Sequence, residues 1–442
     1  MINNKIKYID LFAGIGGIRL GFEQACNDLD ILHQCVMTSE IKPHAIKTLK
    51  QNFNHKNLIG DISQIDTQEI PDFDYLFAGF PCQPFSAGGK RKGFADTRGT
   101  LFFEIERILR DKSPEGFILE NVEGLVKHDL ENKNNKIGRT LKTILNVLEN
   151  KLNYKVSMKV LDSLNFGVPQ QRRRVYIIGT KSTCISLDNF IKKRSILSDI
   201  LEDGLPTLNT EFTKKLLDNF SITDLHGKSI KDKRGGNNNI HIWDIGWRGE
   251  CSEEQKILLN LLLKERRKKH WAKEIGIDWM DGMPLTKKQI STFFPEADLF
   301  GKRNLKKILD DLVNKGYLKF AYPKKLVKIE NDLGSHYLRV DDKTKPKGYN
   351  IVTGKLSVEI NKILDPNGFA PTLVATDMER LVVPEKNGLR KITKREGLRM
   401  FGFPDDFEMP VSDKQAYDLL GNSVVIPVIK NISKRIIETI HN

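Results

Sequence analysis

Near its amino terminus the chain runs Ile9-Asp10-Leu11-Phe12-Ala13-Gly14-Ile15-Gly16-Gly17-Ile18-Arg19-Leu20-Gly21. The apolar run at residues 8–12 predicts a buried strand, the glycines predict a turn, and the residues from 18 onward predict a helix. Glycines also let the backbone approach a ligand closely. The dinucleotide fingerprint would place its third glycine at position 19, where this chain has Arg19. A plain strand–helix turn therefore stays open as an alternative to a ligand-binding loop.

The rest of the first 180 residues continues this alternation of short apolar runs and helical periods. Strands are predicted at residues 8–12, 31–38, 75–78, 117–119, 156–161 and 175–178, and helices at residues 18–25, 44–53, 100–110 and 137–150. Strands that alternate with helices are typical of a doubly wound α/β domain with a mostly parallel sheet.

A second turn follows the apolar run at residues 75–78, with the sequence Phe77-Ala78-Gly79-Phe80-Pro81-Cys82-Gln83-Pro84-Phe85-Ser86. Gly79 and Pro81 end strand pairing and turn the chain outward. We therefore expect Cys82 beyond the carboxyl end of a strand, where open α/β sheets place their sites. The residues that follow, 87–93, are glycine-rich and cationic. A thiol on a stiff turn beside such a loop indicates a nucleophile that acts on a polyanion.

Two carboxylates are expected at the ends of successive extended segments beside the glycine turn. Glu40 follows the strand predicted at 31–38, and Asp61 follows a further short extended run. A carboxylate at such a strand end can accept hydrogen bonds from both ribose hydroxyls of an adenosine-type ligand. Asp61 could accept a hydrogen bond from an adenine amino group. Either residue alone could be a solvated loop acid, but the two together favour a nucleoside cofactor.

A further carboxylate and an arginine cluster flank two later strands. Glu120 ends the apolar run at 117–119, and desolvation there would raise its pKa and suit it to proton donation. A helix N-cap or a paired structural carboxylate is the alternative. Arginines 172–174 precede the strand at 175–178, and in an extended segment Arg172 and Arg174 point one way and Arg173 the other. Two forked guanidiniums suit carbonyl or phosphate recognition, although a solvated basic edge is the alternative.

Composition points to a polyanionic partner and a reducing compartment. The 442 residues suffice for two or three domains, and 71 Lys and Arg against 57 Asp and Glu give a net charge of +14, which favours nucleic acid. The five cysteines form no CxxC pair, so neither a metal site nor a disulfide framework is expected. The amino terminus makes a poor signal peptide, and no apolar stretch reaches the roughly 18 residues of a membrane span. We expect a cytoplasmic protein with no membrane partner.

From about residue 185 the strand alternation weakens and Lys and Asn become frequent. Residues 253–269 carry a helical apolar stripe with a cationic end, and residues 286–294, 303–315 and 317–320 predict helix, helix and strand. That order loosely resembles a winged helix, and a solvated helical insertion is the alternative. Residues 369–373 predict a strand start, and the last apolar segment, 419–440, contains Gly421-Asn422-Ser423 before a helical run.

Taken together, the motifs resemble those of the DNA (cytosine-5)-methyltransferases of bacterial restriction–modification systems. The resemblance covers about residues 5–180 and 368–440 and preserves the family's order of motifs. The matching segments are residues 10–17, residues 79–86, Glu120-Asn121-Val122, Gln171-Arg172-Arg173-Arg174, residues 395–404 and Gly421-Asn422-Ser423-Val424-Val425.

The resemblance implies an S-adenosylmethionine-dependent methyltransferase fold and a target cytosine that is flipped out of the duplex. Cys82 would attack C6 of the ring as a thiolate, which makes C5 nucleophilic enough to accept the methyl group. Glu120 would hold the exocyclic amine and N3, and Arg174, supported by Arg172, would hold O2. The implied cofactor-binding residues are Phe12, Gly14, Gly16, Gly17, Ile18, Glu40, Ile41, Asp61, Pro81, Asn422 and Ser423.

The resemblance also implies a division of the chain. Residues 1–185 would be the catalytic, cofactor-binding domain, residues 186–408 a target-recognition domain with a helical insertion at 250–325, and residues 409–442 a segment that returns to the catalytic domain. The partner would be double-stranded DNA, bound by a monomer, with a restriction endonuclease as a functional partner. The loop 87–99 would close over the flipped base, and the implied DNA contacts are Gln83, Ser86, Lys90, Arg91, Arg98 and Thr372.

Two positions depart from the family pattern. Ile41 and Ile18 stand where the family often has aromatic residues that stack on adenine, and we expect altered cofactor affinity rather than lost activity. A tRNA cytosine-5 methyltransferase is an alternative, although the long basic middle region argues against it. A catalytically silent DNA-binding regulator is another, and the intact Cys82 and Glu120 argue against that one.

Overall fold

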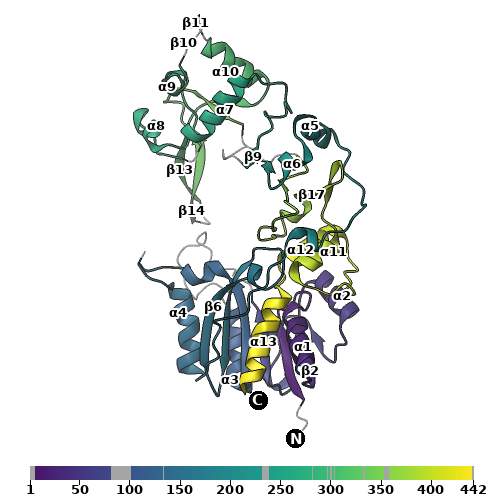
Figure 1. Ribbon diagram of the computed structural model, residues 1–442. Helices are drawn as coiled ribbons and strands as arrows, with labels where there is room; N and C mark the ends of the chain where they lie inside the picture. The colour runs from purple at the N-terminus through teal and green to yellow at the C-terminus, as the bar shows by residue number, and fades with distance from the viewer. Residues whose placement is uncertain are drawn as a thin grey trace. The chain divides into compact units, whose positions relative to one another are not determined.

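The computed structural model of the chain forms two compact units, and each is described by itself (Figure 1). The first unit comprises Met1–Asp203, Asp365–Glu379 and Ile392–Asn442, and the second comprises Gly204–Leu364 and Arg380–Lys391. The structure describes residues 5–80, 101–132, 134–230, 238–280, 282–295, 297–298, 301–302, 304–331, 334–352 and 358–440.

A seven-stranded sheet forms the centre of the first unit, in the order β3-β2-β1-β4-β5-β7-β6. β7 runs antiparallel to its neighbours β5 and β6, and the other neighbouring pairs are parallel. The α/β fold with a mostly parallel sheet is therefore confirmed. The strands are β1 (Ile6–Leu11), β2 (His33–Ser39), β3 (Leu58–Ile59), β4 (Tyr75–Gly79), β5 (Gly116–Val122), β6 (Lys155–Asp162) and β7 (Arg173–Thr180).

Helices cover both faces of this sheet, which explains the nearly continuous apolar runs of its central strands. Ile9 and Leu11 of β1 share one core with α3 (Leu101–Lys112) and α4 (Arg139–Asn146). Tyr8 faces the opposite side, where its ring lies 5.0 Å from that of Phe22 in α1 (Gly17–Asp28). The remaining helix of the amino-terminal half is α2 (Pro43–Asn52).

The carboxyl-terminal helix completes the face that contains α1. α13 (Ile426–Ile440) lies beside α1 in Figure 1, although about 400 residues separate the two helices in sequence. A side-chain carbon built on Gly21 of α1 would lie 2.7 Å from Cβ of Ile429 in α13. Only glycine permits so close an approach at this position.

The unit boundaries differ from the positions 185 and 408 predicted from sequence. Residues 186–203 stay with the first unit, where the amide of Gly167 donates to the carbonyl of Lys193 at 3.0 Å and the amide of Leu197 donates to Gly368 at 2.9 Å. α11 (Lys394–Phe401) and α12 (Asp413–Gly421) also belong to this unit. The predicted strand at 369–373 is not formed, because Ala370 makes only an isolated bridge to Gln170.

The second unit has a five-stranded sheet and a helical part. The sheet order is β18-β17-β16-β8-β9, built from β8 (Ser229–Ile230), β9 (Asn239–Ile240), β16 (Lys362–Ile363), β17 (Leu381–Glu385) and β18 (Gly388–Lys391), and packed with α5 (Glu211–Asn219) and α6 (Ile222–Leu225). The helical part contains α7 (Glu253–Glu265), α8 (Lys269–Glu274), α9 (Lys287–Phe293) and α10 (Leu305–Asn314), with β10 (Ala297–Asp298) and β11 (Gly301–Lys302) between the last two.

The predicted order of helix, helix and strand within residues 286–320 is confirmed, since α9 and α10 precede β12 (Leu318–Ala321). The strands that follow are β13 (Lys324–Asn331), β14 (Gly334–Asp341) and β15 (Gly348–Ile351). One member of the predicted cationic end at 264–273 is not on the surface. Arg266 is 4% exposed and donates to Oδ1 of Asn350 at 2.7 Å, so it stabilises the core of this part.

Candidate active site

The sheet register brings four predicted segments to one edge. Leu11 pairs with Ser39 and Ala78, and Gly79 pairs with Glu120, so the ends of β1, β2, β4 and β5 lie together. The glycine turn, Glu40, the turn after β4 and Glu120 all begin at this edge, as expected for an open parallel sheet.

The glycine turn is shaped by three residues in the left-handed region. Phe12, Gly14 and Gly16 have φ of 53°, 57° and 82°. A side-chain carbon on Gly16 would lie 2.5 Å from the ring of Phe53, so this glycine is required by packing as well as by conformation. At Gly14 a side-chain carbon would meet no atom within 4 Å, which leaves open space beside the turn.

Glu40 holds the glycine turn against the start of α2. Its buried carboxylate accepts from the backbone amide of Gly14 at 2.7 Å and from the amides of Ile41 and Lys42 at 2.8 Å each. The side chain of Ile41 is 70% exposed, so an apolar surface faces solvent directly beside this carboxylate.

Asp61 has a local structural role in the segment that follows β3. Its Oδ1 accepts from the amide of Ser63 at 3.0 Å and from the Ser63 hydroxyl at 2.8 Å, which caps a short 3-10 turn. Both bonds are made by one oxygen, and the residue is exposed. Ile18, by contrast, is 3% exposed and lies near Gly79.

Arg19 stands where the dinucleotide fingerprint would have its third glycine, and it makes contacts of its own. The guanidinium donates to Glu23 at 2.8 Å and lies 4.3 Å from the centre of the Phe53 ring. It therefore links α1 to the segment after α2, which a glycine could not do.

Glu120 and Arg174 form a buried acid–guanidinium pair at the end of β5. Nε of Arg174 lies 3.1 Å from Oε1 of Glu120, an ion pair without hydrogen-bond alignment. Burial raises the pKa of Glu120, and the positive charges of Arg174 and Arg172 only partly oppose this. A carboxyl group in that state is suited to proton donation.

A cavity of about 500 Å³ opens beside this pair, and Arg174 and Thr372 are among its lining residues. The Thr372 hydroxyl donates to the carbonyl of Gln171 at 2.7 Å. Arg173 points away from Glu120 and pairs with Glu123 at 2.9 Å, in agreement with the predicted alternation of the three arginines.

Arg172 connects this edge of the sheet to the carboxyl-terminal segments of the first unit. Its guanidinium donates to the carbonyls of Leu373 and Gly421 at 3.1 Å each, and it lies 5.3 Å from the centre of the Phe401 ring. Burial lowers the pKa of Arg172 to about 10, so the group remains charged at neutral pH. These contacts indicate that Arg172 has a positioning role: it holds the segments that contain Leu373 and Gly421 against the strand that carries Arg174.

Ser423 lies next to the glycine turn, and Asn422 precedes it in the chain. The hydroxyl oxygen of Ser423 would be 3.3 Å from a side-chain carbon built on Gly17. The side-chain amide of Asn422 donates to the carbonyl of Asp418 at 2.8 Å. The structure thus brings together residues that are about 400 positions apart in sequence.

The predicted nucleophile, one predicted cofactor-binding residue (Pro81) and most predicted DNA contacts lie outside the described residues. These residues are Pro81, Cys82, Gln83, Ser86, Lys90, Arg91 and Arg98, together with the rest of the loop 87–99. The last described residue before them is Phe80, whose carbonyl accepts from the side-chain amide of Asn121 at 3.0 Å. Asn121 was not predicted as a site residue, although it directly follows Glu120 in the quoted motif.

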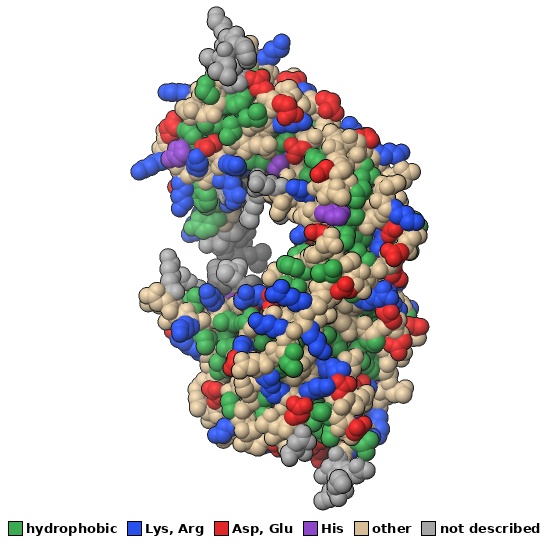
Figure 2. Space-filling model, viewed as in Figure 1, with side chains coloured by type: hydrophobic (Ala, Val, Ile, Leu, Met, Phe, Trp, Pro, Cys, Tyr) green, Lys and Arg blue, Asp and Glu red, His purple; other side chains and the backbone are tan. Residues whose placement is uncertain are grey.

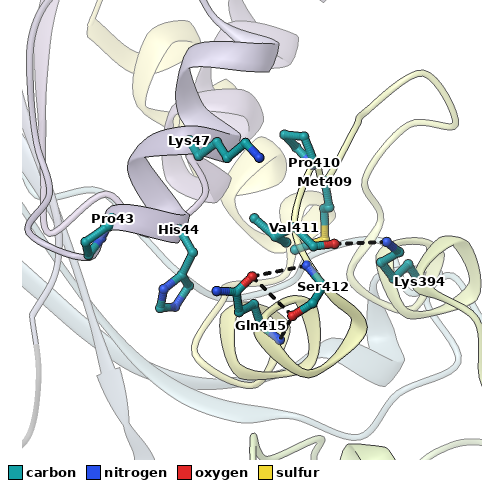
Figure 3. A pocket seen from close by; sticks show the side chains of 9 residues that line it. All are labelled: Pro43, His44, Lys47, Lys394, Met409, Pro410, Val411, Ser412 and Gln415. Atoms are coloured by element: carbon teal, nitrogen blue, oxygen red, sulfur yellow. Dashed lines mark hydrogen bonds between the residues drawn. The ribbon is translucent and has the colours of Figure 1, made fainter.

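A separate cavity of about 680 Å³ lies between α2 and the segment that precedes α12 (Figure 3). None of the predicted site residues lines it. His44, Lys47 and Lys394 are among its lining side chains, and Nζ of Lys394 donates to the carbonyl of Val411 at 3.1 Å.

Among the described residues, no group of three or more His, Cys, Asp or Glu side chains could hold a metal ion. Within the same part of the chain, no helix is long and apolar enough to cross a membrane.

The family model for C-5 cytosine-specific DNA methylases matches residues 6–438. The chain belongs to this family. The recognition made from the motifs is confirmed, and with it the enzyme class, a DNA (cytosine-5)-methyltransferase.

Several type II methyltransferases match this chain over nearly its whole length. The type II methyltransferase M.NlaIV of Neisseria lactamica is 56% identical over 436 residues, which cover 99% of this chain and all of the relative. M.NgoBV of Neisseria gonorrhoeae is 55% identical over the same shares. M.BanI of Aneurinibacillus aneurinilyticus is 41% identical over 97% of this chain and 95% of its own.

Solved structures support the fold. A prophage-encoded E. coli protein described as a DNA modification methyltransferase superposes with a TM-score of 0.53 at 22% identity, over 99% of this chain and 100% of that one. The Dnmt2 methyltransferase of S. pombe gives a TM-score of 0.51 at 17% identity, over the same shares.

Proposed function

We propose that this methyltransferase transfers a methyl group from S-adenosylmethionine to C5 of a flipped cytosine in duplex DNA, and that it protects host DNA in a restriction–modification system. The observation that supports this most directly is the buried Glu120–Arg174 pair, which lies beside the strand end that leads to Cys82. The type II names of the relatives support the restriction–modification setting, in which a restriction endonuclease would cut the unmodified sites. We expect a monomer to act on the DNA.

The glycine turn and its neighbours fit S-adenosylmethionine. The open space at Gly14 could hold the methionine part of the cofactor, and the exposed apolar side chain of Ile41 could contact the adenine ring. The second carboxylate oxygen of Asp61, which Ser63 does not contact, could accept from the adenine amino group. Glu40 would bind the ribose hydroxyls with the lone pairs that its backbone bonds leave available. Phe12, Gly16, Gly17, Ile18, Pro81, Asn422 and Ser423 complete the proposed set. When bound, the cofactor supplies an electrophilic methyl group.

The chain's own residues would activate the base by a covalent route. The Cys82 thiolate would form a bond to C6 of cytosine, and the ring electrons displaced towards C5 would take the methyl group. Glu120, whose pKa is raised by burial, would protonate or hydrogen-bond N3, while Arg174 would hold O2. Loss of the C5 proton and elimination of the thiolate would then release 5-methylcytosine and restore Cys82.

The proposal is tested with the Cys82→Ser variant and a duplex that contains 5-fluorocytosine. The wild-type enzyme should form a stable covalent complex with this duplex, because fluorine at C5 cannot leave as a proton. The variant should form no complex and transfer no methyl group, yet bind the cofactor as the wild type does. Normal turnover by the variant would remove Cys82 from the mechanism.

The substrate class is tested with labelled cofactor offered to duplex DNA and to tRNA. Label in DNA alone is expected. Label in tRNA alone would overturn the proposal in favour of a tRNA methyltransferase, and binding of DNA with no transfer to either would favour a silent regulator. Bisulfite sequencing of DNA from expressing cells would then give the recognition sequence.

A further inference from the structure

The helical part of the second unit has the topology of a winged helix. α7, α9 and α10 share one core with β12 and β15, which pair antiparallel from Leu318↔Ile351 to Ala321↔Gly348. Leu285 adds a bridge to Tyr349, as the short first strand of such a module does. Between β12 and β15 the chain makes one long hairpin, β13–β14, which we call the wing.

The wing extends beyond this core as a two-stranded ribbon (Figure 1). Eight residue pairs join its strands, from Lys324↔Asp341 to Asn331↔Gly334, which corresponds to a length of about 26 Å. All the side chains described at 324–328 and 337–339 are exposed. Exposed side chains add little stability to a two-stranded ribbon, so the exposure of these positions suits contact with a partner.

The two faces of the wing differ in chemistry. Because side chains alternate along a strand, one face holds Lys324, Leu326 and Lys328 opposite Asp341, Arg339 and Tyr337. We call this the cationic face, and on it Tyr337 is 66% exposed. The other face, which we call the apolar face, includes Val327 and Leu338, which are 37% and 48% exposed.

The wing differs in net charge from α10, the helix that would be expected to contact DNA in a winged helix. On α10, Lys306 pairs with Asp310 at 2.5 Å and Lys315 with Asp311 at 2.7 Å, so its exposed acids and bases largely cancel. Residues 319–347, which contain the wing and the strand and turn at its base, have eight Lys and Arg against four Asp and Glu. Lys324 lies 3.9 Å from Asp341 and Lys325 lies 3.6 Å from Asp342, and the excess of positive charge remains after these pairs are counted. At that base, Nζ of Lys347 lies 4.8 Å from the centre of the Tyr322 ring. Figure 2 shows cationic and apolar side chains together on the surface of this part of the second unit.

We propose that the wing enters the major groove of duplex DNA with its cationic face, and that Arg339 and Tyr337 make its central contacts. The groove is about 12 Å wide and admits a two-stranded ribbon, and guanidinium groups are the commonest readers of guanine there. The excess of basic residues favours DNA over an apolar protein partner as the occupant. The proposal rests on the DNA-directed function above and names the element that contacts the groove.

The test compares two double variants of the full-length enzyme on the same hairpin. Tyr337→Thr with Arg339→Thr removes the two proposed central contacts of the cationic face, and Val327→Thr with Leu338→Thr is the matched control on the apolar face. Threonine retains strand propensity, so the hairpin should survive in both. Lys307→Ala tests α10 separately. The probe is a duplex enriched from an unmethylated random pool by binding to the wild type, which requires no methyl transfer.

The cationic-face variant should bind this duplex at least about tenfold more weakly and should lose protection of guanine N7, an atom in the major groove. The two controls should stay within about twofold of the wild type, and cofactor affinity should be unchanged in all three. Equal binding by the cationic-face variant, a loss confined to Lys307→Ala, or enrichment of no duplex would overturn the proposal. The proposal would also be overturned, in favour of a protein partner, by two results together. The cationic-face variant would bind DNA normally, and only the apolar-face variant would change the oligomeric state. Methyl transfer is measured in parallel. If the wild type transfers no methyl group but the cationic-face variant still loses DNA binding, the proposed function fails and the proposal for the wing stands.

Discussion

Asp10 is a carboxylic acid inside the parallel sheet of the first unit. It is 1% exposed, and neither of its oxygens has a hydrogen-bond partner among the described residues. Burial raises its pKa from 3.8 to about 8, and the charge of Arg19 offsets this only in part. The sequence showed Asp10 within an apolar run but gave no sign of this environment, which depends on the packing of α1 over β1.

The raised pKa of Asp10 predicts a pH-dependent stability. Between pH 4 and 8 the folded chain holds a proton on Asp10 that the unfolded chain releases, so the free energy of unfolding should fall as the pH rises. The loss is at most about 1.4 kcal/mol per pH unit for one group. Asp10→Asn should abolish this part of the slope. Denaturant titrations at several pH values measure it.

The matched control for Asp10 is Asp72→Asn, since the side chain of Asp72 is 96% exposed. It should keep the wild-type slope. Identical slopes for the wild type and Asp10→Asn would show that Asp10 is ionised in the folded protein.

Single residues mark the limit of what sequence alone could predict about the site. Glu40 was predicted as a ribose ligand, and the structure adds that its carboxylate accepts three backbone amides and so shapes the glycine turn. Arg172 was predicted beside Arg174, but its bonds to Leu373 and Gly421 depend on chain segments more than 200 residues away. Sequence spacing indicates which residue types are available, whereas such distant contacts follow only from the fold.

At the scale of elements, the close contact of α1 and α13 yields a second prediction. Gly21→Ala would normally favour a helix by up to about 1 kcal/mol. Here the new carbon would lie 2.7 Å from Ile429 and 3.0 Å from the backbone oxygen of Ile426. Such overpacking typically costs 1–3 kcal/mol, so we expect a net destabilisation on the order of 1 kcal/mol in denaturant unfolding.

Gly60→Ala provides the comparison for Gly21. A side-chain carbon there would meet no atom within 4 Å, so stability should be unchanged or slightly raised. An increase in stability for Gly21→Ala would mean that the two helices separate more readily than their contact indicates.

Elements with a buried face were predictable, and elements without one were not. The predicted strands and helices of the first 180 residues followed from their apolar patterns, since each has buried or partly buried apolar side chains. The wing was missed because its side chains at 324–328 and 337–339 are exposed on both faces and therefore leave no periodic signal. The expected strand at 369–373 failed because its only strand-like pairing with the segment before β7 is the isolated bridge of Ala370 to Gln170.

At the scale of the whole chain, the first unit is assembled from three separate segments. Its amino-terminal part supplies the sheet, and Ile392–Asn442 returns to cover one face of it. Motif order alone suggested this return, but the position of its start could not be predicted, because residues 380–391 first form β17 and β18 in the second unit.

This assembly predicts that a chain ending at Lys391 cannot fold its first unit. The deletion removes six fully buried apolar side chains of α13: Ile426, Val428, Ile429, Ile432, Ile436 and Ile437. At about 2 kcal/mol each, their burial contributes on the order of 10 kcal/mol, which is comparable to the total stability of a typical domain. The deletion also removes the carbonyls of Met400 and Gly421, leaving buried donors of Gln170 and Arg172 unsatisfied.

Calorimetry and near-ultraviolet circular dichroism measure the outcome of this truncation. We expect the unfolding transition of the first unit and its cofactor binding to disappear together, whereas a chain ending at Ile440 should retain both. Supplying residues 392–442 as a separate peptide should restore part of the signal, because α13 contacts α1 through side-chain packing without needing the covalent link. A cooperative transition in the truncated chain would show that the amino-terminal sheet is stable without its carboxyl-terminal cover.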